Sequence, residues 1–240
     1  MVQIKKKPKS KSTFFPRLWR IIRNTIIVFF VGSISWVILA RFIPIYITPL
    51  MLIRNVEAII AGEMPQNHKS WVSINEISPN MVQAVVASED NLFLTHYGFS
   101  FEDIEKAMKH NQKGKRIRGG STISQQTAKN VFLWPQRSYI RKGLEAYFTV
   151  LIELVWSKER IMEVYLNVIE TGEGVYGVEA ASQRFFNKSA TKLTKSQAAL
   201  IAASLPNPRK FKIGNPSGYM LRRQSKIKSL MGKIHQVKFP

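Results

Sequence analysis

The sequence predicts a mainly α-helical protein with one N-terminal transmembrane helix. A stretch of 17 uncharged, mostly apolar residues follows a basic N-terminus, at 24–40. Several later segments combine apolar residues at helical spacing with a Ser or Thr at the expected N-cap. No segment shows the sustained two-residue alternation of a half-buried strand. With 240 residues, 45% of them hydrophobic, the chain is long enough for one ordinary domain with an appendage.

The first element is the apolar segment 24–40, which lies at the short end of the range for a membrane span. Eight Lys or Arg precede it, Arg41 closes it, and "FIPIYITPLMLI" prolongs it. Interfacial aromatic candidates are Trp19, Trp36 and Tyr46. We expect a retained anchor rather than a cleaved signal peptide, because no small-x-small cleavage site follows. A buried core helix is disfavoured, because the segment is flanked by charges and lacks polar periodicity.

The charge distribution sets the expected orientation. Basic residues before the span place the N-terminus in the cytoplasm, and residues from about 45 onward outside. The expected organisation is a basic cytoplasmic tail (1–23), a transmembrane anchor (24–45), a connector (46–70), a main domain (71–215) and a basic C-terminal segment (216–240).

Helices are then predicted in order along the exported part. Ser78 and Pro79 suit the cap and first turn of a helix at 78–90. Ser100 and Asp103 form a predicted capping box for a helix at 100–112, which leads into a basic, glycine-containing loop. Further helices are predicted at 121–133, 139–156, 157–169, 175–186 and 194–205.

The net charge of +21 indicates an anionic partner: a phosphate, a nucleic acid or an anionic bilayer. Nucleic acid is disfavoured for a domain outside the cytoplasm. The chain has no cysteine, so disulfides and thiolate metal sites are excluded. It also lacks an HExxH zinc motif, and "GKRIRGGS" lacks the Gly-Lys-Ser/Thr ending of a P-loop.

Five segments together carry a more specific signal. They are "EDNLFLTHYG", "GGSTISQQTAKN", "RKGLE", "SKERIMEVYLN" and "VYGVEAASQRFFNKSATKLTKSQAALIAASLPNP". In this order, over about residues 70–210, they resemble the motifs of the peptidoglycan glycosyltransferases, and the spacing is most similar to the monofunctional biosynthetic transglycosylases. The tail "YLNVIETGEG" departs from the Tyr-Leu-Asn-x-x-Tyr-x-Gly of many bifunctional relatives, which puts finer acceptor contacts in doubt. Because the sequence has no Lys-Thr-Gly, no transpeptidase domain is expected.

The resemblance implies a lysozyme-like helical glycosyltransferase domain with a smaller membrane-proximal subdomain. It implies polymerisation of lipid II, a disaccharide-pentapeptide on undecaprenyl pyrophosphate, into β-1,4-linked glycan with inversion and release of undecaprenyl pyrophosphate. The expected location is the bacterial inner (cytoplasmic) membrane, with the catalytic domain periplasmic or extracytoplasmic. Expected partners are lipid II, the growing glycan and membrane lipids, with cell-division or elongation proteins as candidates and no nucleic acid.

The same resemblance assigns the reacting groups. Glu89 is the implied general base, which takes the proton of the attacking sugar hydroxyl. At the end of an apolar helix in a cleft, its pKa can be raised toward neutrality. Lys129, Arg141 and Lys142 occupy family positions for stabilising the pyrophosphate. Glu145 is the family's second glutamate, which either orients those cations or assists at the pyrophosphate.

Further polar positions match the family less specifically. Ser121, Thr122 and Gln126 are implied to contact sugars or phosphates. A divalent cation, Mg²⁺ or Mn²⁺, is a candidate cofactor that bridges the pyrophosphate, with Asp90 as candidate ligand and substrate-binding residue. No dedicated metal cage is visible, and no organic cofactor is expected.

Two alternative functions remain open. A lysozyme-like lytic enzyme would use Glu89 as an acid, but the cations would then have no purpose. An inactive membrane scaffold of the cell-wall machinery would not need the complete set of Glu89, Lys129, Arg141 and Glu145.

Overall fold

The computed structural model describes residues 14–100, 102, 105 and 120–239. The predicted capping box of Ser100 and Asp103, most of the predicted helix 100–112 and nearly all of the loop after it lie outside the described residues.

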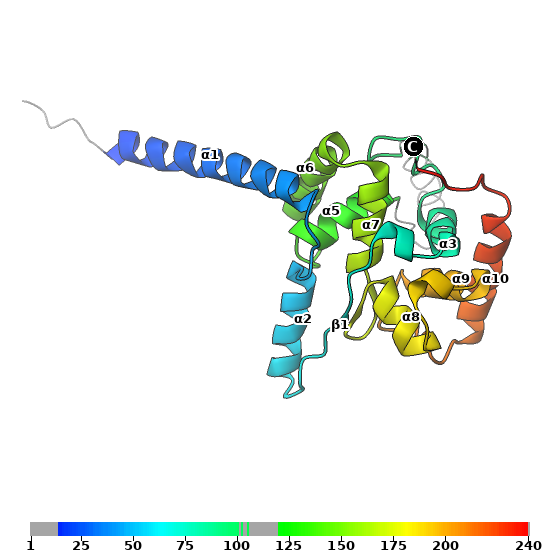
Figure 1. Cartoon of the computed structure of the whole chain (residues 1–240). Helices are drawn as coiled ribbons and strands as arrows, with labels where there is room; N and C mark the ends of the chain where they lie inside the picture. The colour runs from blue at the N-terminus through cyan, green and yellow to red at the C-terminus, as the bar shows by residue number, and fades with distance from the viewer. Residues whose placement is uncertain (1–13, 101, 103–104, 106–119, 240) are drawn as a thin grey trace, which may run out of the picture.

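A long N-terminal helix, α1 (Phe14–Ala40), projects from the rest of the protein (Figure 1). The stretch Pro16–Ala40 has a mean hydropathy of 1.9 and is long and apolar enough to cross a membrane. Its side chains are almost all exposed, as expected for a helix surrounded by lipid rather than by protein. The structure thus agrees with a single N-terminal membrane anchor.

The C-terminal end of α1 is attached to the domain by direct contacts. Val37 and Ala40 are fully buried, and the indole nitrogen of Trp156 donates to the Val37 carbonyl at 2.8 Å. The guanidinium of Arg160 donates to the Ala40 carbonyl at 2.9 Å and also to the Ile43 carbonyl. The last carbonyls of a helix lack intrahelical partners, so these contacts satisfy groups that would otherwise need water.

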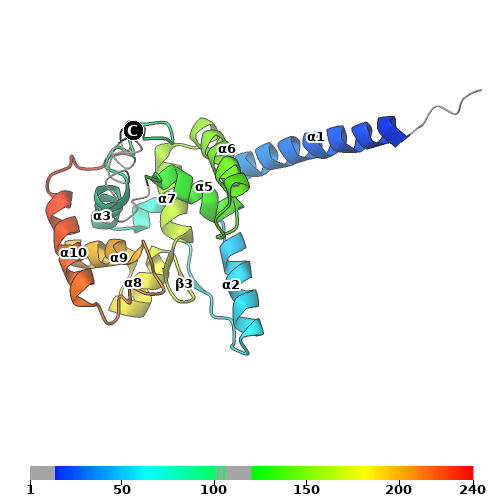
Figure 2. The ribbon, with the colours of Figure 1, turned by 180° about the vertical axis from the view of Figure 1, so that it is seen from behind.

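Six of the seven helices predicted after residue 70 are present, and the seventh, at 100–112, lies mostly outside the described residues. They are α3 (Pro79–Glu89), α5 (Ile123–Phe132), α6 (Tyr139–Val155), α7 (Lys158–Val168), α8 (Val178–Phe186) and α9 (Lys195–Ser204), with short 3-10 turns η1 (Ile74–Glu76) and η2 (Ala190–Lys192). The mainly α-helical class is therefore confirmed. Contacts between α3 and α9, α5 and α6, and α5 and α7 build one shared core, seen from the other side in Figure 2.

Two further helices are not predicted by the sequence analysis. α2 (Pro49–Ile60) starts at the Thr48 cap, within the segment expected to be a connector. α10 (Gly218–Met231), capped by Ser217, lies within the basic C-terminal segment and packs on α3 and α9. The apolar signal of α10 is weak because only Met220, Ile227 and Met231 are fully buried on it.

A small sheet is also absent from the sequence prediction. It consists of β1 (His68–Lys69), β2 (Glu170–Gly172) and β3 (Val175–Tyr176), in the order β1-β3-β2, with β1 parallel and β2 antiparallel to β3. Strands this short carry no detectable alternation. The helix predicted from 175 instead begins at Val178, after Gly177 turns the chain at φ +82°. A side chain there would meet the Asn167 carbonyl at 2.8 Å, so only glycine fits.

Candidate active site

Glu89 lies at the C-terminal end of α3, and its side chain is 14% exposed. The preceding residues of α3, among them Val85, Val86 and Ala87, are buried, so the helix is held rigidly in the core. Glu89 Oε2 accepts a hydrogen bond from Gln126 Nε2 at 3.1 Å. Burial raises the pKa of the Glu89 carboxyl, and the Gln126 hydrogen bond and the Arg223 charge partly oppose this.

The amide of Gln126 is itself oriented from α7. The hydroxyl of the fully buried Tyr165 donates to Gln126 Oε1 at 3.3 Å. Burial raises the pKa of this phenol well above its usual value, so the hydroxyl keeps its proton and acts as a donor. Because the amide oxygen faces Tyr165, the amide nitrogen faces Glu89. Tyr165, Gln126 and Glu89 thus form a chain of hydrogen bonds from the core to the carboxylate.

A cation cluster forms at the start of α6. Glu145 is buried, and its two oxygens pair with Arg141 Nη1 and Lys142 Nζ, each at 2.5 Å. Arg141 is buried as well, whereas the Lys142 side chain is 48% exposed and contacts Ser121 Oγ at 3.4 Å. The buried Arg141 Nε has no hydrogen-bond partner among the described residues. The cluster therefore provides fixed positive charge, of which the Lys142 ammonium is the part exposed to solvent.

Lys129 brings a cation of α5 to the same place. Burial lowers the pKa of its ammonium, the charge of Glu145 raises it, and the charges of Arg141 and Lys142 lower it further. These interactions place Lys129 close to the cluster, as expected from the sequence. Lys129 and Gln126 also line one cavity of about 220 Å³, together with Arg54, Asn130, Trp134 and Tyr165.

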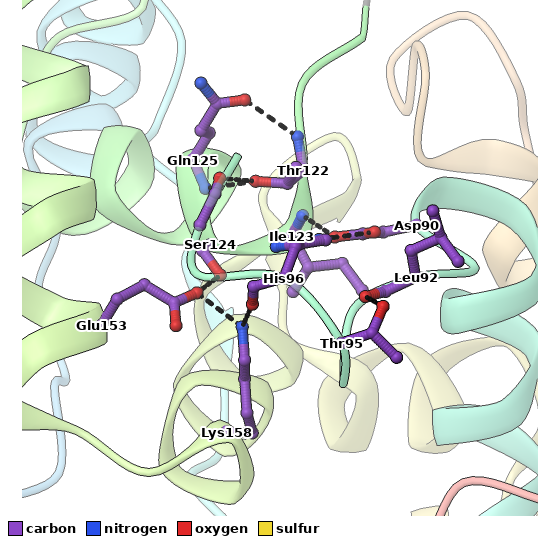
Figure 3. Close-up of polar contacts among 11 residues, drawn as sticks. Asp90, Leu92, Thr95, His96, Thr122, Ile123, Ser124, Gln125, Glu153 and Lys158 are labelled. Atoms are coloured by element: carbon purple, nitrogen blue, oxygen red, sulfur yellow. Dashed lines mark hydrogen bonds and ion pairs between the residues drawn. The ribbon is translucent and has the colours of Figure 1, made fainter. Parts of the chain in front are cut away.

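Asp90 has a different environment from its neighbour Glu89. It is 2% exposed, and its two oxygens lie 2.9 and 3.0 Å from His96 Nε2 (Figure 3). Oδ2 also accepts from the backbone N–H of Ile123 at 3.0 Å, at the N-terminus of α5, where a carboxylate is favourable. The hydroxyl of the buried Thr122 donates to the Gly98 carbonyl at 2.7 Å. Asp90 and Thr122 thus join the loop after α3 to α5.

Both Asp90 oxygens contact protein donors, so this carboxylate serves the packing of the loop against α5. The described residues contain no group of three or more His, Cys, Asp or Glu that could hold a metal ion. The structure brings seven of the sequence-predicted residues into one region: Glu89, Ser121, Gln126, Lys129, Arg141, Lys142 and Glu145. The side chains of Asp90 and Thr122 instead face the protein interior.

Other residues support the site without having been singled out in the sequence. Lys158 Nζ donates to the His96 carbonyl at 2.6 Å and to Glu153 Oε1 at 2.7 Å, and lies 4.8 Å from the centre of the Phe93 ring. Ser124 on α5 donates to the same Glu153 oxygen. These contacts tie α5, α6 and α7 to the loop after α3 (Figure 3).

The packing of the loop after α3 against α6 explains why the loop contains Gly98. Gly98 has φ +81°, and a side chain there would lie 2.6 Å from Thr149 Cγ2 on α6. Tyr165 and Lys158 both lie in the motif "SKERIMEVYLN", which forms α7. A polar residue among the apolar positions of that helix was the sequence signal that could have identified them.

In chemical terms, one short stretch of α5 lies between a possible proton acceptor, Glu89, and a cluster of cations that could hold an anion. Gln126 contacts the Glu89 carboxylate, and Lys129, about one turn later, faces the cations of α6. A buried carboxylate with a raised pKa suits general base catalysis. Fixed cations suit an anionic leaving group.

Comparison with known proteins finds one matching family model and several similar proteins. A family model described as Transglycosylase matches residues 57–232. The biosynthetic peptidoglycan transglycosylase of Bacteroides thetaiotaomicron is 57% identical over 224 residues, covering 93% of this chain and 90% of the relative. That of Bdellovibrio bacteriovorus is 57% identical over 213 residues, with coverage of 87% and 85%. That of Escherichia coli is 51% identical over 221 residues, with 91% of each chain covered.

Proposed function

Because the chain belongs to the transglycosylase family and is a peptidoglycan glycosyltransferase, we propose that it polymerises lipid II into β-1,4-linked glycan, with Glu89 as the general base. One observation carries the proposal: α5 bears both Gln126, which donates to the Glu89 carboxylate, and Lys129, whose ammonium feels the charges of Glu145, Arg141 and Lys142. A proton acceptor and an anion site are the two things that this reaction needs.

The reaction begins with a sugar hydroxyl of the acceptor, which is a poor nucleophile. Glu89 takes the proton of that hydroxyl as the oxygen attacks the anomeric carbon of the donor. The bond from that carbon to the pyrophosphate breaks, and the electron pair leaves with undecaprenyl pyrophosphate. Direct displacement inverts the α-linked donor to a β-linked product, without a covalent sugar–enzyme intermediate.

The leaving pyrophosphate develops negative charge, which Lys129, Arg141 and Lys142 stabilise in this proposal. The exposed ammonium of Lys142 is a donor available to phosphate oxygens, and the buried Arg141 adds a fixed positive charge beside it. Glu145 acts as a positioning residue, because both of its oxygens hold cations of the cluster. A divalent cation, if the reaction uses one, would bind through the substrate pyrophosphate, since Asp90 is engaged by His96 and Ile123.

The proposed setting is the outer face of the bacterial inner membrane. α1 would span the bilayer with its basic N-terminus in the cytoplasm, which supports a domain next to a lipid-linked substrate. Lipid II, the growing glycan and membrane lipids are the proposed partners. Cell-division or elongation proteins are the protein partners that such a polymerase would meet there.

The test uses the full-length protein in detergent with labelled lipid II. We expect a polymer that lysozyme degrades, and at least about a hundredfold lower initial rate for Glu89→Gln, since one general base contributes about two to four orders of magnitude. A lytic enzyme would instead cleave finished glycan and leave lipid II unconsumed. Glu89→Gln with near-normal turnover would refute the assignment of the base.

A further inference from the structure

The C-terminal helix α10 carries one arginine on its buried face. Its fully buried residues are Met220, Ile227 and Met231, and Arg223 lies three residues after the first and four before the second. Residues at these spacings share one face of a helix, so Arg223 points toward α3 and α9. Its side chain is 28% exposed, whereas the neighbouring Arg222 is exposed to solvent.

On that face, Arg223 meets the carboxylate of Glu89. Arg223 Nη2 lies 3.6 Å from Glu89 Oε1. The other carboxylate oxygen, Oε2, accepts the hydrogen bond from Gln126. Among the described residues, Oε1 otherwise contacts only the Ser88 hydroxyl, at a long 3.4 Å. The two oxygens of Glu89 are therefore approached by groups from two different helices, α5 and α10.

The distance matters for the chemistry. At 3.6 Å the guanidinium attracts the carboxylate by charge but does not form a normal hydrogen bond. Oε1 thus keeps a lone pair for an incoming proton, while Oε2 is occupied by the Gln126 amide. The Nε of Arg223 is buried and has no hydrogen-bond partner among the described residues, so the Arg223 guanidinium is not committed to another acceptor at that atom.

We propose that Arg223 is a positioning residue for glycosyl transfer, which holds the Glu89 carboxylate so that Oε1 faces the acceptor hydroxyl. This inference rests on the proposed role of Glu89 as the base. It gives the basic C-terminal segment a part in the reaction, although that segment lies far from Glu89 in the sequence. The alternative is an ion pair that only helps to dock α10.

The test compares kcat and KM for lipid II in the full-length protein. We expect Arg223→Ala to lower kcat about tenfold or more and to leave KM within about twofold. Arg223→Lys, which keeps a charge near Oε1, should restore most of kcat. Arg223→Gln keeps much of the buried stem and serves if Arg223→Ala fails to fold. Arg222→Ala, which removes the exposed neighbouring charge, is the matched control and should match the wild type.

A double mutant separates positioning from docking. If Arg223 acts through Glu89, adding Arg223→Ala to Glu89→Gln should lower the residual rate less than twofold, because the target carboxylate is already gone. A tenfold further loss in the double mutant would overturn the proposal, as would a folded Arg223→Ala or Arg223→Gln with wild-type kcat. If Glu89→Gln alone kept the wild-type rate, the proposed function itself would fail, which is a separate outcome.

Discussion

Glu89 is contacted by side chains from two helices other than its own, Gln126 of α5 and Arg223 of α10, which suits the proposed role of its carboxylate as a general base. Burial raises the pKa of its carboxyl, which strengthens it as a proton acceptor. Gln126 and Arg223 favour the ionised form and so limit that rise. The balance leaves the pKa of the carboxyl above that of an ordinary glutamate, while the carboxyl can still ionise.

The pH dependence of Glu89 follows from the direction of that shift. Its native pKa lies above the unfolded value of about 4.3, so the native state binds the proton more tightly. The free energy of unfolding therefore falls as pH rises from the unfolded pKa through the native pKa. We expect Glu89→Gln, which cannot ionise, to gain melting temperature relative to the wild type across this window. Melting curves at several pH values test this, and a difference that shrinks with rising pH would contradict it.

Activity should follow the same group with the opposite trend. Only the ionised carboxylate accepts a proton, so kcat/KM should rise with pH through the native pKa of Glu89. The acidic limb of the profile should lie above the range of an ordinary glutamate. A limb near the ordinary value would mean that burial does not perturb the base.

Tyr165 tests the hydrogen-bond chain behind Glu89. Tyr165→Phe removes the donor to Gln126 Oε1 and leaves that oxygen without its partner. The amide is then less strongly held with its nitrogen toward Glu89. A neutral hydrogen bond contributes about 0.5–1.5 kcal/mol, so we expect roughly a two- to tenfold loss of kcat in a folded protein. Wild-type kcat with unchanged melting would show that the amide orientation does not depend on Tyr165.

At the scale of elements, α5 connects the parts of the site. Its N-terminus is capped by Thr122 and receives the Asp90 carboxylate, which fixes it to the loop after α3. Farther along, Gln126 and Lys129 face Glu89 and the cations of α6. A shift of α5 would therefore disturb the proton acceptor and the anion site together.

The cations of α5 and α6 give a prediction at this scale. Lys129→Ala removes a buried charge that faces the proposed pyrophosphate, and one such donor contributes roughly 2.7–4 kcal/mol by analogy with oxyanion holes. We expect a loss of about a hundredfold or more in lipid II consumption. Arg141→Lys keeps the charge but loses the planar donor set, so it should lose much of the rate, though less than Lys129→Ala.

The measurement is the initial rate of lipid II consumption for each variant, with thermal melting to check folding. A lytic enzyme acting on finished glycan has no pyrophosphate to stabilise, so neither change should slow it much. Folded variants with wild-type rates would remove the pyrophosphate role of both cations.

At the scale of the whole molecule, α1 and α10 lie on opposite sides of the domain (Figures 1 and 2). α1 is attached through Trp156, which caps the C-terminus of α6, and through Arg160, which lies in α7. The anchor is thus joined to helices that also build the site. This attachment suits an enzyme whose proposed substrate is itself held in the membrane.

The orientation of the anchor is the prediction at this scale. The basic residues before α1 should stay in the cytoplasm. A reporter that is active only outside the cytoplasm should therefore be active when it is fused after Pro240. The control is a cytoplasmic reporter at the same position, which should be silent. The reverse pattern would refute the proposed topology.

Much of the fold could be predicted because its signals are local. Caps such as Ser78 and the uncharged stretch of α1 act within a few residues, and both led to correct helices. α2, α10 and the small sheet were missed, since their formation depends on packing against distant segments. For the site, the family resemblance of the motifs pointed to Glu89, Lys129 and Glu145, but the sequence did not show which way the side chain of Asp90, adjacent to Glu89, points.

The sequence by itself determined the helical class, the long apolar N-terminal helix, the family motifs and the acid and cations of the candidate site. Only the tertiary structure decided which of these groups meet. It turns Asp90 inward to His96 and Ile123, aligns Gln126 through Tyr165, and brings Arg223 from α10 to Glu89. The physical reason is that backbone preferences and caps depend on neighbours in the chain, whereas contacts between distant side chains depend on how the helices pack.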